Sequence, residues 1–325
     1  MSVTKEYFGR VPATGQTVDR FIITDGDYVA AILTWGAVLH TFSFRKRNIV
    51  TSADDLAVYL PWSNHMGEVV GPFANRIAKG RFSIDGNLYQ LEINNGVNHL
   101  HSGSANFGDK VWKVVSIKDN SVELESGSYD TEGGFPGNIT IRTLYTLEGG
   151  SLSIHYTVRT DRKTVVNITN HAYFNLHGRA EDIRDHVVKL DCPKYLEVDD
   201  GLIPIAVKDV EGTDFDFTSP HAIGERRDGF YDHCFIFGER KHGEVIADGL
   251  KLEVDTDCEG MQLYTGKAFN VPGCTQGDFG PYQGFCLETS GYPDSPNRED
   301  FPSCILSPGE VYERTTVYTL GEVQL

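Results

Sequence analysis

The chain has 325 residues, of which 40% are hydrophobic and 23% are charged, and its formal net charge is −17. This acidity argues against nucleic acid and anionic membranes as partners, because both repel a strongly negative protein. No apolar run approaches the roughly 18 residues that a membrane-spanning helix needs, and the opening MSVTKEYFGR lacks the apolar core of a signal peptide.

Patterns with a period of two residues recur along the chain, whereas helical patterns are scarce. The segment 80–94, GRFSIDGNLYQLEIN, predicts a hairpin with its turn at Asp85 and Gly86, because this pair tolerates the positive φ angles of tight turns. One short helix is expected near 54–60. The other predicted strands are 28–35, 111–117, 121–126, 138–147, 151–159, 187–191, 233–238, 249–255, 260–265, 283–288 and 311–320.

Many short strands at this spacing predict an all-β sandwich or barrel. No repeat, low-complexity tract or linker interrupts the pattern, so we expect one domain covering 1–325. The Gly- and Pro-rich stretch 266–284 predicts a long loop beside a strand, and loops of that length are often functional.

Residues 166–176, VNITNHAYFNL, alternate between apolar and polar side chains, as in a half-buried strand. The polar face holds neutral hydrogen-bonding groups in place of the usual charged mixture. It consists of Asn167, Thr169, His171, Tyr173 and Asn175. A satisfied, half-exposed histidine is the plain interpretation of His171, and a ligand-binding face is the alternative.

Two further places carry candidate chemistry before the middle of the chain. Asn75 and Arg76 precede the predicted hairpin, where a surface arginine in a turn is the plain interpretation. His99 and His101 lie two residues apart, which on a strand puts both on one face and suggests a metal pair. The nearest following carboxylate, Asp109, is eight residues from His101, so this spacing does not support a metal site.

A fourth candidate, Glu288, lies near the end of the predicted strand 283–288, on the face opposite Phe285 and Leu287. An edge charge is its plain interpretation. Phosphate-binding, dinucleotide-binding, zinc-protease and hydrolase motifs are absent from the sequence. A β protein with a neutral polar face, histidines, an arginine and a glutamate suits a neutral polyhydroxylated ligand, with acid–base chemistry as a further option.

These stretches resemble the aldose 1-epimerase (galactose mutarotase) family. The matching segments run in the family's order from about residue 10 to 320, and they are ANRIAKGRF, NNGVNHLHSG, GDKVW, NITNHAYFNLHG, YDHCF, GMQLYTG, GFCLET followed by YPDSPN, and FPSCILSPGEVYERTTVY near the end of the chain. The resemblance implies a large antiparallel β-sandwich of the supersandwich type with an open sugar-binding cleft. It implies an isomerase that opens, rotates and recloses free aldohexoses such as galactose and glucose, with no cofactor and no metal.

The resemblance also implies roles for particular residues. Glu288 corresponds to the general base that takes the proton from the C1 hydroxyl, and His171 to the general acid that protonates the ring oxygen. His101 corresponds to the histidine that hydrogen-bonds near the reacting end of the sugar. Positions that bind sugar hydroxyls correspond to Asn75, Arg76, Asp232 and Gln262. His99 has no role that the family would assign.

Three positions depart from the family pattern, namely Pro72, Cys234 and Ser290. None is a proposed catalytic residue, but Pro72 and Ser290 could change which sugar is preferred. The sequence leaves open whether galactose or glucose is favoured and whether the chain is a monomer or a dimer.

Rival functions remain at this point. A hexose-6-phosphate 1-epimerase would need a cationic cluster for the phosphate, with candidates at 45–47 and at Arg226 and Arg227. A non-catalytic sugar-binding protein on the same fold, or a carbohydrate-binding module, would have no need for both an acid and a base. The six cysteines form no CxxC pair, so we expect reduced thiols and a cytoplasmic protein.

Overall fold

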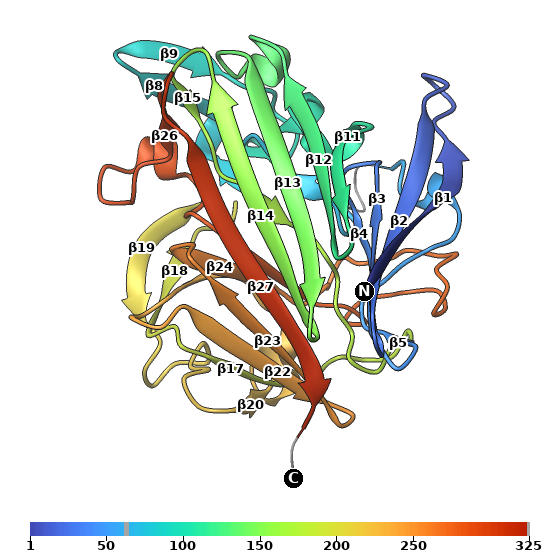
Figure 1. Cartoon of the computed structure of the whole chain (residues 1–325). Helices are drawn as coiled ribbons and strands as arrows, with labels where there is room; N and C mark the ends of the chain where they lie inside the picture. The colour runs from blue at the N-terminus through green and yellow to red at the C-terminus, as the bar shows by residue number, and fades with distance from the viewer. Residues whose placement is uncertain (62–64, 324–325) are drawn as a thin grey trace.

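The computed structural model of the protein describes residues 1–61 and 65–323. Within these ranges the chain forms antiparallel sheets connected by turns and by single turns of 3₁₀-helix (Figure 1). The N-terminal sheet has five strands in chain order: β1 (Ser2–Arg10), β2 (Thr17–Asp25), β3 (Tyr28–Leu33), β4 (Leu39–Phe44) and β5 (Arg47–Asn48). None of the described helices has the length and apolar character needed to span a bilayer.

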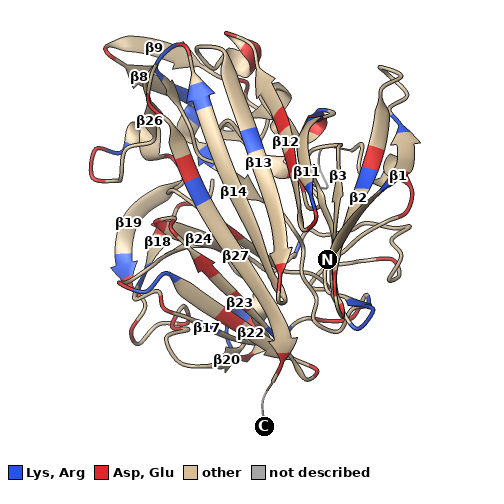
Figure 2. Cartoon of the chain, in the orientation of Figure 1, with Lys and Arg blue, Asp and Glu red and all other residues tan. Residues whose placement is uncertain are grey.

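The largest sheet crosses the middle of the molecule, with the long C-terminal strand between segments that are far apart in the sequence (Figure 1). Its strands lie in the order β11 (Lys113–Lys118), β12 (Ser121–Ser128), β13 (Ile139–Glu148), β14 (Ser151–Thr160), β27 (Tyr312–Glu322), β23 (Leu250–Thr256), β22 (His242–Ala247), β17 (Val187–Leu190) and β20 (His221–Ala222). Acidic and basic residues both occur along its strands, as on β27 (Figure 2).

A second five-stranded sheet carries most of the predicted site residues from the C-terminal half. Its order is β19 (Pro204–Asp209), β18 (Lys194–Val198), β21 (Asp232–Ile236), β24 (Gly260–Tyr264) and β25 (Cys286–Ser290). Four two-stranded pairs complete the described sheets: β7 (Arg76–Ile77) with β10 (His99–Leu100), β6 (Val69–Val70) with β16 (Thr169–Asn170), β8 (Arg81–Ile84) with β9 (Asn87–Gln90), and β15 (Thr164–Val165) with β26 (Ile305–Leu306).

One hydrophobic core joins the three large sheets into a sandwich. Strand β13 alternates between buried and less buried residues, so its inner side chains, such as Ile141 and Tyr145, face this core. The same cluster contains Phe42 of the N-terminal sheet and Leu287 of β25. Each large apolar side chain that is fully buried contributes about 1.5–3 kcal/mol. Buried tyrosines tie the layers further, since the hydroxyl of Tyr145 donates to the carbonyl of Ala37 at 2.6 Å.

The predicted hairpin is confirmed, with β8 and β9 joined by Asp85 and Gly86, whose φ angles are 50° and 78°. The helix expected near 54–60 is reduced to one 3₁₀ turn, η1 (Leu56–Val58), capped by the carboxylate of Asp55. The loop predicted at 266–284 is confirmed, because its only ladder contact is an isolated bridge between Val271 and Phe279 among the described residues.

The expectation of a half-buried strand over 166–176 is wrong. Only Thr169 and Asn170 belong to a strand there, and every residue of the segment is buried. The alternation does not separate a core face from a solvent face, because the polar side chains are also enclosed by protein. The amide of Asn175, for example, donates to two backbone carbonyls, at 2.8 and 2.9 Å. Most of this polar row therefore holds irregular segments together.

Candidate active site

Glu288 lies in the middle of β25, an edge strand of the second five-stranded sheet, and is 4% exposed. Its side chain stands opposite Gln262 of β24 in the strand register. The neighbouring carbonyl of Leu287 accepts a 2.8 Å hydrogen bond from the buried hydroxyl of Tyr318, which fixes β25 against the largest sheet. The backbone that carries the Glu288 carboxylate is therefore fixed by its pairing with β24 on one side and by the buried Tyr318 hydroxyl on the other.

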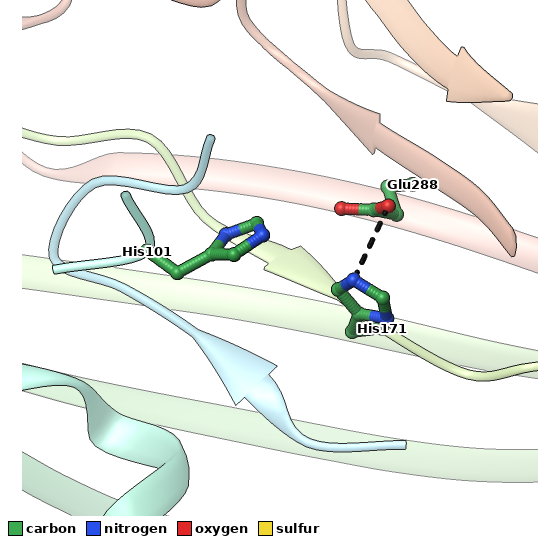
Figure 3. Close-up of side chains that lie close together, drawn as sticks. All are labelled: His101, His171 and Glu288. Carbon is green, nitrogen blue, oxygen red and sulfur yellow. Dashed lines mark ion pairs between the residues drawn. The ribbon is translucent and has the colours of Figure 1, made fainter. Parts of the chain in front are cut away.

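His171 follows directly after β16 and reaches the same point from the opposite direction. Its Nε2 lies 3.5 Å from Oε1 of Glu288, and both side chains are 5% exposed (Figure 3). Its Nδ1 lies 3.5 Å from the Sγ of Cys286. Burial raises the pKa of the Cys286 thiol well above its ordinary value. The thiol therefore keeps its proton and adds no negative charge beside the ring, which presents Nε2 to Glu288.

His101 is the third buried group and follows β10. Its ring is turned toward the other two side chains (Figure 3) and lies 5.4 Å from the ring of His171, measured between centroids. The backbone N–H of Asn75 donates to Nδ1 of His101 at 3.1 Å, so the ring proton is on Nε2. The backbone of His101 in turn donates to the carbonyl of Asn75. Asn75 thus acts on the site chiefly by fixing the tautomer of His101.

The remaining predicted residues lie around this centre. Asp232 and Gln262 come from adjacent strands, and Nε2 of Gln262 donates to Oδ1 of Asp232 at 2.5 Å. Oε1 of Gln262 is buried and has no hydrogen-bond partner among the described residues, so it is available to accept from a ligand hydroxyl. Arg76 donates from Nε to the side chain of Asn95 at 3.0 Å. Its charge also acts on Glu288, whose pKa it lowers against the larger effect of burial.

The electrostatics of the central pair follow from burial. Desolvation, helped by the charge of Asp232, raises the pKa of Glu288 to about 8. Desolvation, helped by a charge on His65, lowers the pKa of His171 to about 3. Both pKa shifts favour the neutral form of the side chain, as expected in a site shielded from water. Near neutral pH the pair therefore holds one proton between a carboxyl and an imidazole, and the two behave as one acid–base unit.

The nitrogen and oxygen atoms of His101, His171 and Glu288 lie within 4.8 Å of one another. Two imidazoles and one carboxylate are a donor set that suits a divalent transition metal. The same three groups also suit proton transfer without a metal, because an acid, a base and a hydrogen-bond donor converge on one point.

Sequence reasoning missed two residues of this site, His65 and Glu68. The ring of His65 lies 4.8 Å from that of His101 and 5.5 Å from that of His171, measured between centroids. Its Nδ1 lies 2.8 Å from Oε1 of Glu68. The only signal available was a histidine and a glutamate three residues apart in HMGE, a spacing that is common on protein surfaces.

Other residues that the sequence singled out serve elsewhere. His99 is fully buried and donates from Nδ1 to the carbonyl of Glu92, with its ring against Phe135. Tyr173 stacks on Phe269, with centroids 3.9 Å apart, and its ring centroid lies 5.1 Å from that of His171. Ser290 donates to the carbonyl of Gly291 at 2.9 Å.

Both the sequence and the fold are similar to those of known proteins. The family model described as Aldose 1-epimerase matches residues 19–319. Galactose mutarotase from Rattus norvegicus is 38% identical over 337 residues, covering 97% of this chain and 98% of the rat protein. Galactose mutarotase from Bos taurus is 37% identical over 335 residues, with the same coverage. The crystal structure of galactose 1-epimerase from Lactobacillus acidophilus superposes with a TM-score of 0.89 at 25% identity and covers 99% of both chains.

Proposed function

Because this chain belongs to the aldose 1-epimerase family, we propose that it interconverts the α and β anomers of free aldohexoses such as galactose and glucose. The observation that carries this proposal is the buried pair of His171 and Glu288, 3.5 Å apart, inside a shell of sugar-compatible polar groups. Anomer interconversion requires one proton to leave O1 and one to reach O5, which is the task of such a pair.

The reaction proceeds through the charged form of the pair, a carboxylate on Glu288 and an imidazolium on His171, which forms when the shared proton passes from the carboxyl group to the imidazole. Glu288 takes the proton from the O1 hydroxyl while His171 gives its proton to O5. The C1–O5 bond breaks and C1 becomes a carbonyl. Rotation about C1–C2 then presents the other face of the carbonyl. On closure O5 attacks C1, His171 recovers the proton from O5, and Glu288 returns a proton to O1.

The raised pKa of Glu288 and the lowered pKa of His171 fit this cycle. Since one proton is shared, each group is the base in one half of the cycle and the acid in the other. A carboxylate poised near neutral pH is a more effective base than an ordinary exposed one. His101 donates from Nε2, and we assign it a hydrogen bond near the reacting end of the sugar.

Binding of the sugar is assigned to Asn75, Arg76, Asp232 and Gln262. Hydrogen bonds with a charged partner are the stronger ones, so we give Arg76 and Asp232 the largest share of the affinity. The buried Oε1 of Gln262 is available to a sugar hydroxyl. Asn75 contributes mainly through its backbone contact with His101.

The candidate phosphate-binding clusters offer little support to a hexose-6-phosphate epimerase. Arg45 is exposed and pairs with Asp27 and Glu322. Arg226 donates to backbone carbonyls of the loop around Asp216. These guanidinium groups are already engaged by the protein itself, which favours an uncharged substrate. We further infer that the protein acts in the cytoplasm, since its six cysteines are all unpaired thiols.

Polarimetry on freshly dissolved α-D-galactose and α-D-glucose tests the proposal. The wild type should accelerate the drift to equilibrium, and Glu288→Gln should not. A chelator should leave the wild-type rate unchanged, because the proposed steps involve no metal. Failure to accelerate either sugar, together with acceleration of glucose 6-phosphate, would transfer the proposal to the phosphorylated substrate. If the protein accelerates the mutarotation of none of the three sugars, a non-catalytic sugar-binding protein would be the remaining interpretation.

A further inference from the structure

Among the described residues, the ring of His65 lies nearer to that of His101 than the ring of His171 does, yet His65 comes just before the turn at 66–67, far from His101 in the sequence. Its side chain is 8% exposed, and its backbone adopts a positive φ of 44°. That conformation is unfavourable for a residue with a Cβ and persists only where the surroundings impose it. The surroundings therefore hold this ring against those of His101 and His171.

Glu68 is the anchor of the His65 ring. Its carboxylate is 5% exposed and accepts from Nδ1 of His65 at 2.8 Å and from Nδ2 of Asn106 at 2.7 Å, both on Oε1. The space it occupies exists because residue 108 is glycine, since a Cβ there would overlap with the carboxylate of Glu68. A buried carboxylate needs such partners to offset the loss of water. Glu68 thus fixes which nitrogen of His65 carries the proton and how the ring is turned.

The backbone links this pair directly to the catalytic acid. The N–H of His171 donates to the carbonyl of Glu68, and the N–H of Gly67 donates to the carbonyl of His171, both at 2.9 Å. The amide of Asn170 also donates to the carbonyl of Gly67 at 2.8 Å. Hydrogen bonds therefore join segment 65–70 to the segment that carries His171.

We propose that His65 and Glu68 form a positioning pair for the two catalytic-site histidines: Glu68 orients the ring of His65, and this ring holds the imidazoles of His101 and His171 in place. The proposal rests on the function proposed above. It assigns a role to two residues that take no part in the proton transfers themselves.

The charged groups around the pair are consistent with this role. A charge on His65 lowers the pKa of His171 and, with His171 itself, that of His101, in both cases second to burial. On the other side, Glu68 helps burial to raise the pKa of Asp109 to about 6. Arg76 also acts on His101, and Glu288 and Cys286 face His171.

His65→Phe tests the pair because it keeps a ring of similar size and removes both nitrogens. We expect kcat for galactose mutarotation to fall about 10–100-fold, the size seen when the hydrogen-bonding partner of a metal-ligating histidine is lost, with KM little changed. The acid limb of the pH profile should move to higher pH, because His171 loses a neighbouring charge. Glu68→Gln should lower kcat in the same direction, and the double variant should be no slower than His65→Phe alone.

Asp255→Asn is the matched control, since Asp255 holds the buried His242 at 2.9 Å on the largest sheet, outside the site. It should leave kcat and the pH profile unchanged. Wild-type kcat and an unmoved acid limb in His65→Phe would overturn the proposal, even if its melting temperature falls. If His65→Phe does not fold, the same two measurements, kcat and the acid limb of the pH profile, are made on Glu68→Gln and decide the proposal.

Side-chain NMR titration of the histidines provides a readout that is independent of activity. The pKa values of His101 and His171 should rise in His65→Phe relative to the wild type. If the wild type has no mutarotase activity but these values rise, the proposed function fails and the positioning pair stands. If the wild type is active but the pKa values of His101 and His171 are unchanged in His65→Phe, the positioning pair is overturned and the proposed function stands.

Discussion

Replacing Glu288 with glutamine should abolish most of the activity and at the same time stabilise the protein at alkaline pH. The substitution keeps the shape of the side chain in β25 but removes its charge. Loss of a positioned base lowers kcat about 10²–10⁴-fold. The stability effect comes from the pKa of Glu288, which burial raises to about 8 from an ordinary value of 4.5.

The sign follows from proton linkage. In the folded chain Glu288 keeps its proton up to about pH 8, whereas in the unfolded chain it releases it near its ordinary value. Stability is therefore lost as pH rises through this window. Each tenfold difference in proton affinity corresponds to about 1.4 kcal/mol, so between about pH 6 and pH 9 the wild type should lose about 3 kcal/mol more than the glutamine variant.

Urea unfolding of both proteins at about pH 6 and about pH 9 measures this difference. Glu288→Ala is the control, because it removes the same charge but leaves a cavity that destabilises the fold at both pH values. A glutamine variant whose stability relative to the wild type does not change with pH would refute the burial argument for Glu288.

Three further predictions follow from the site. The wild-type kcat/KM should fall above about pH 8, because the pair then loses its shared proton. On the acid side it should fall only well below the ordinary pKa of histidine, because burial lowers the pKa of His171 to about 3. An acid limb near pH 6.5 in steady-state assays would contradict this prediction. Asp232→Asn should raise KM for galactose about tenfold through a weaker hydrogen bond, with kcat largely kept; an unchanged KM would remove Asp232 from the binding set. Gly108→Ala should destabilise the protein by about 1–3 kcal/mol through overlap with Glu68, measured as a lower melting temperature; a wild-type value would show that this carboxylate is free to shift.

Local patterns were sufficient for part of this architecture. The Asp85–Gly86 turn predicted its hairpin because the constraint lies within two residues. The alternation around Glu288 placed its carboxylate on the face opposite Leu287, since side-chain direction on a strand depends only on the count of residues. The N-terminal strands β1 and β2 escaped prediction because their apolar residues do not alternate cleanly, as the burial pattern of β1 shows.

The site itself required information that no local pattern carries. The pairing of Gln262 with Glu288 is a register between strands, and the approach of His65 to His171 depends on the backbone hydrogen bonds that join Gly67 and Glu68 to His171, about 100 residues further along the chain. The row 166–176 misled because alternation does not reveal which polar groups the protein will itself enclose. The open cleft and the single domain over 1–325 stay predictions.

The most direct test of the account is the rate of exchange between α- and β-galactose at equilibrium, measured by NMR magnetisation transfer. Wild type, Glu288→Gln, His171→Asn and the double variant would be compared at equal concentration. Since the two groups share one proton, the wild type should exchange far faster than the uncatalysed sugar, and the double variant should be about as slow as either single variant. Full activity in either single variant, or a wild-type rate equal to the uncatalysed one, would contradict the account.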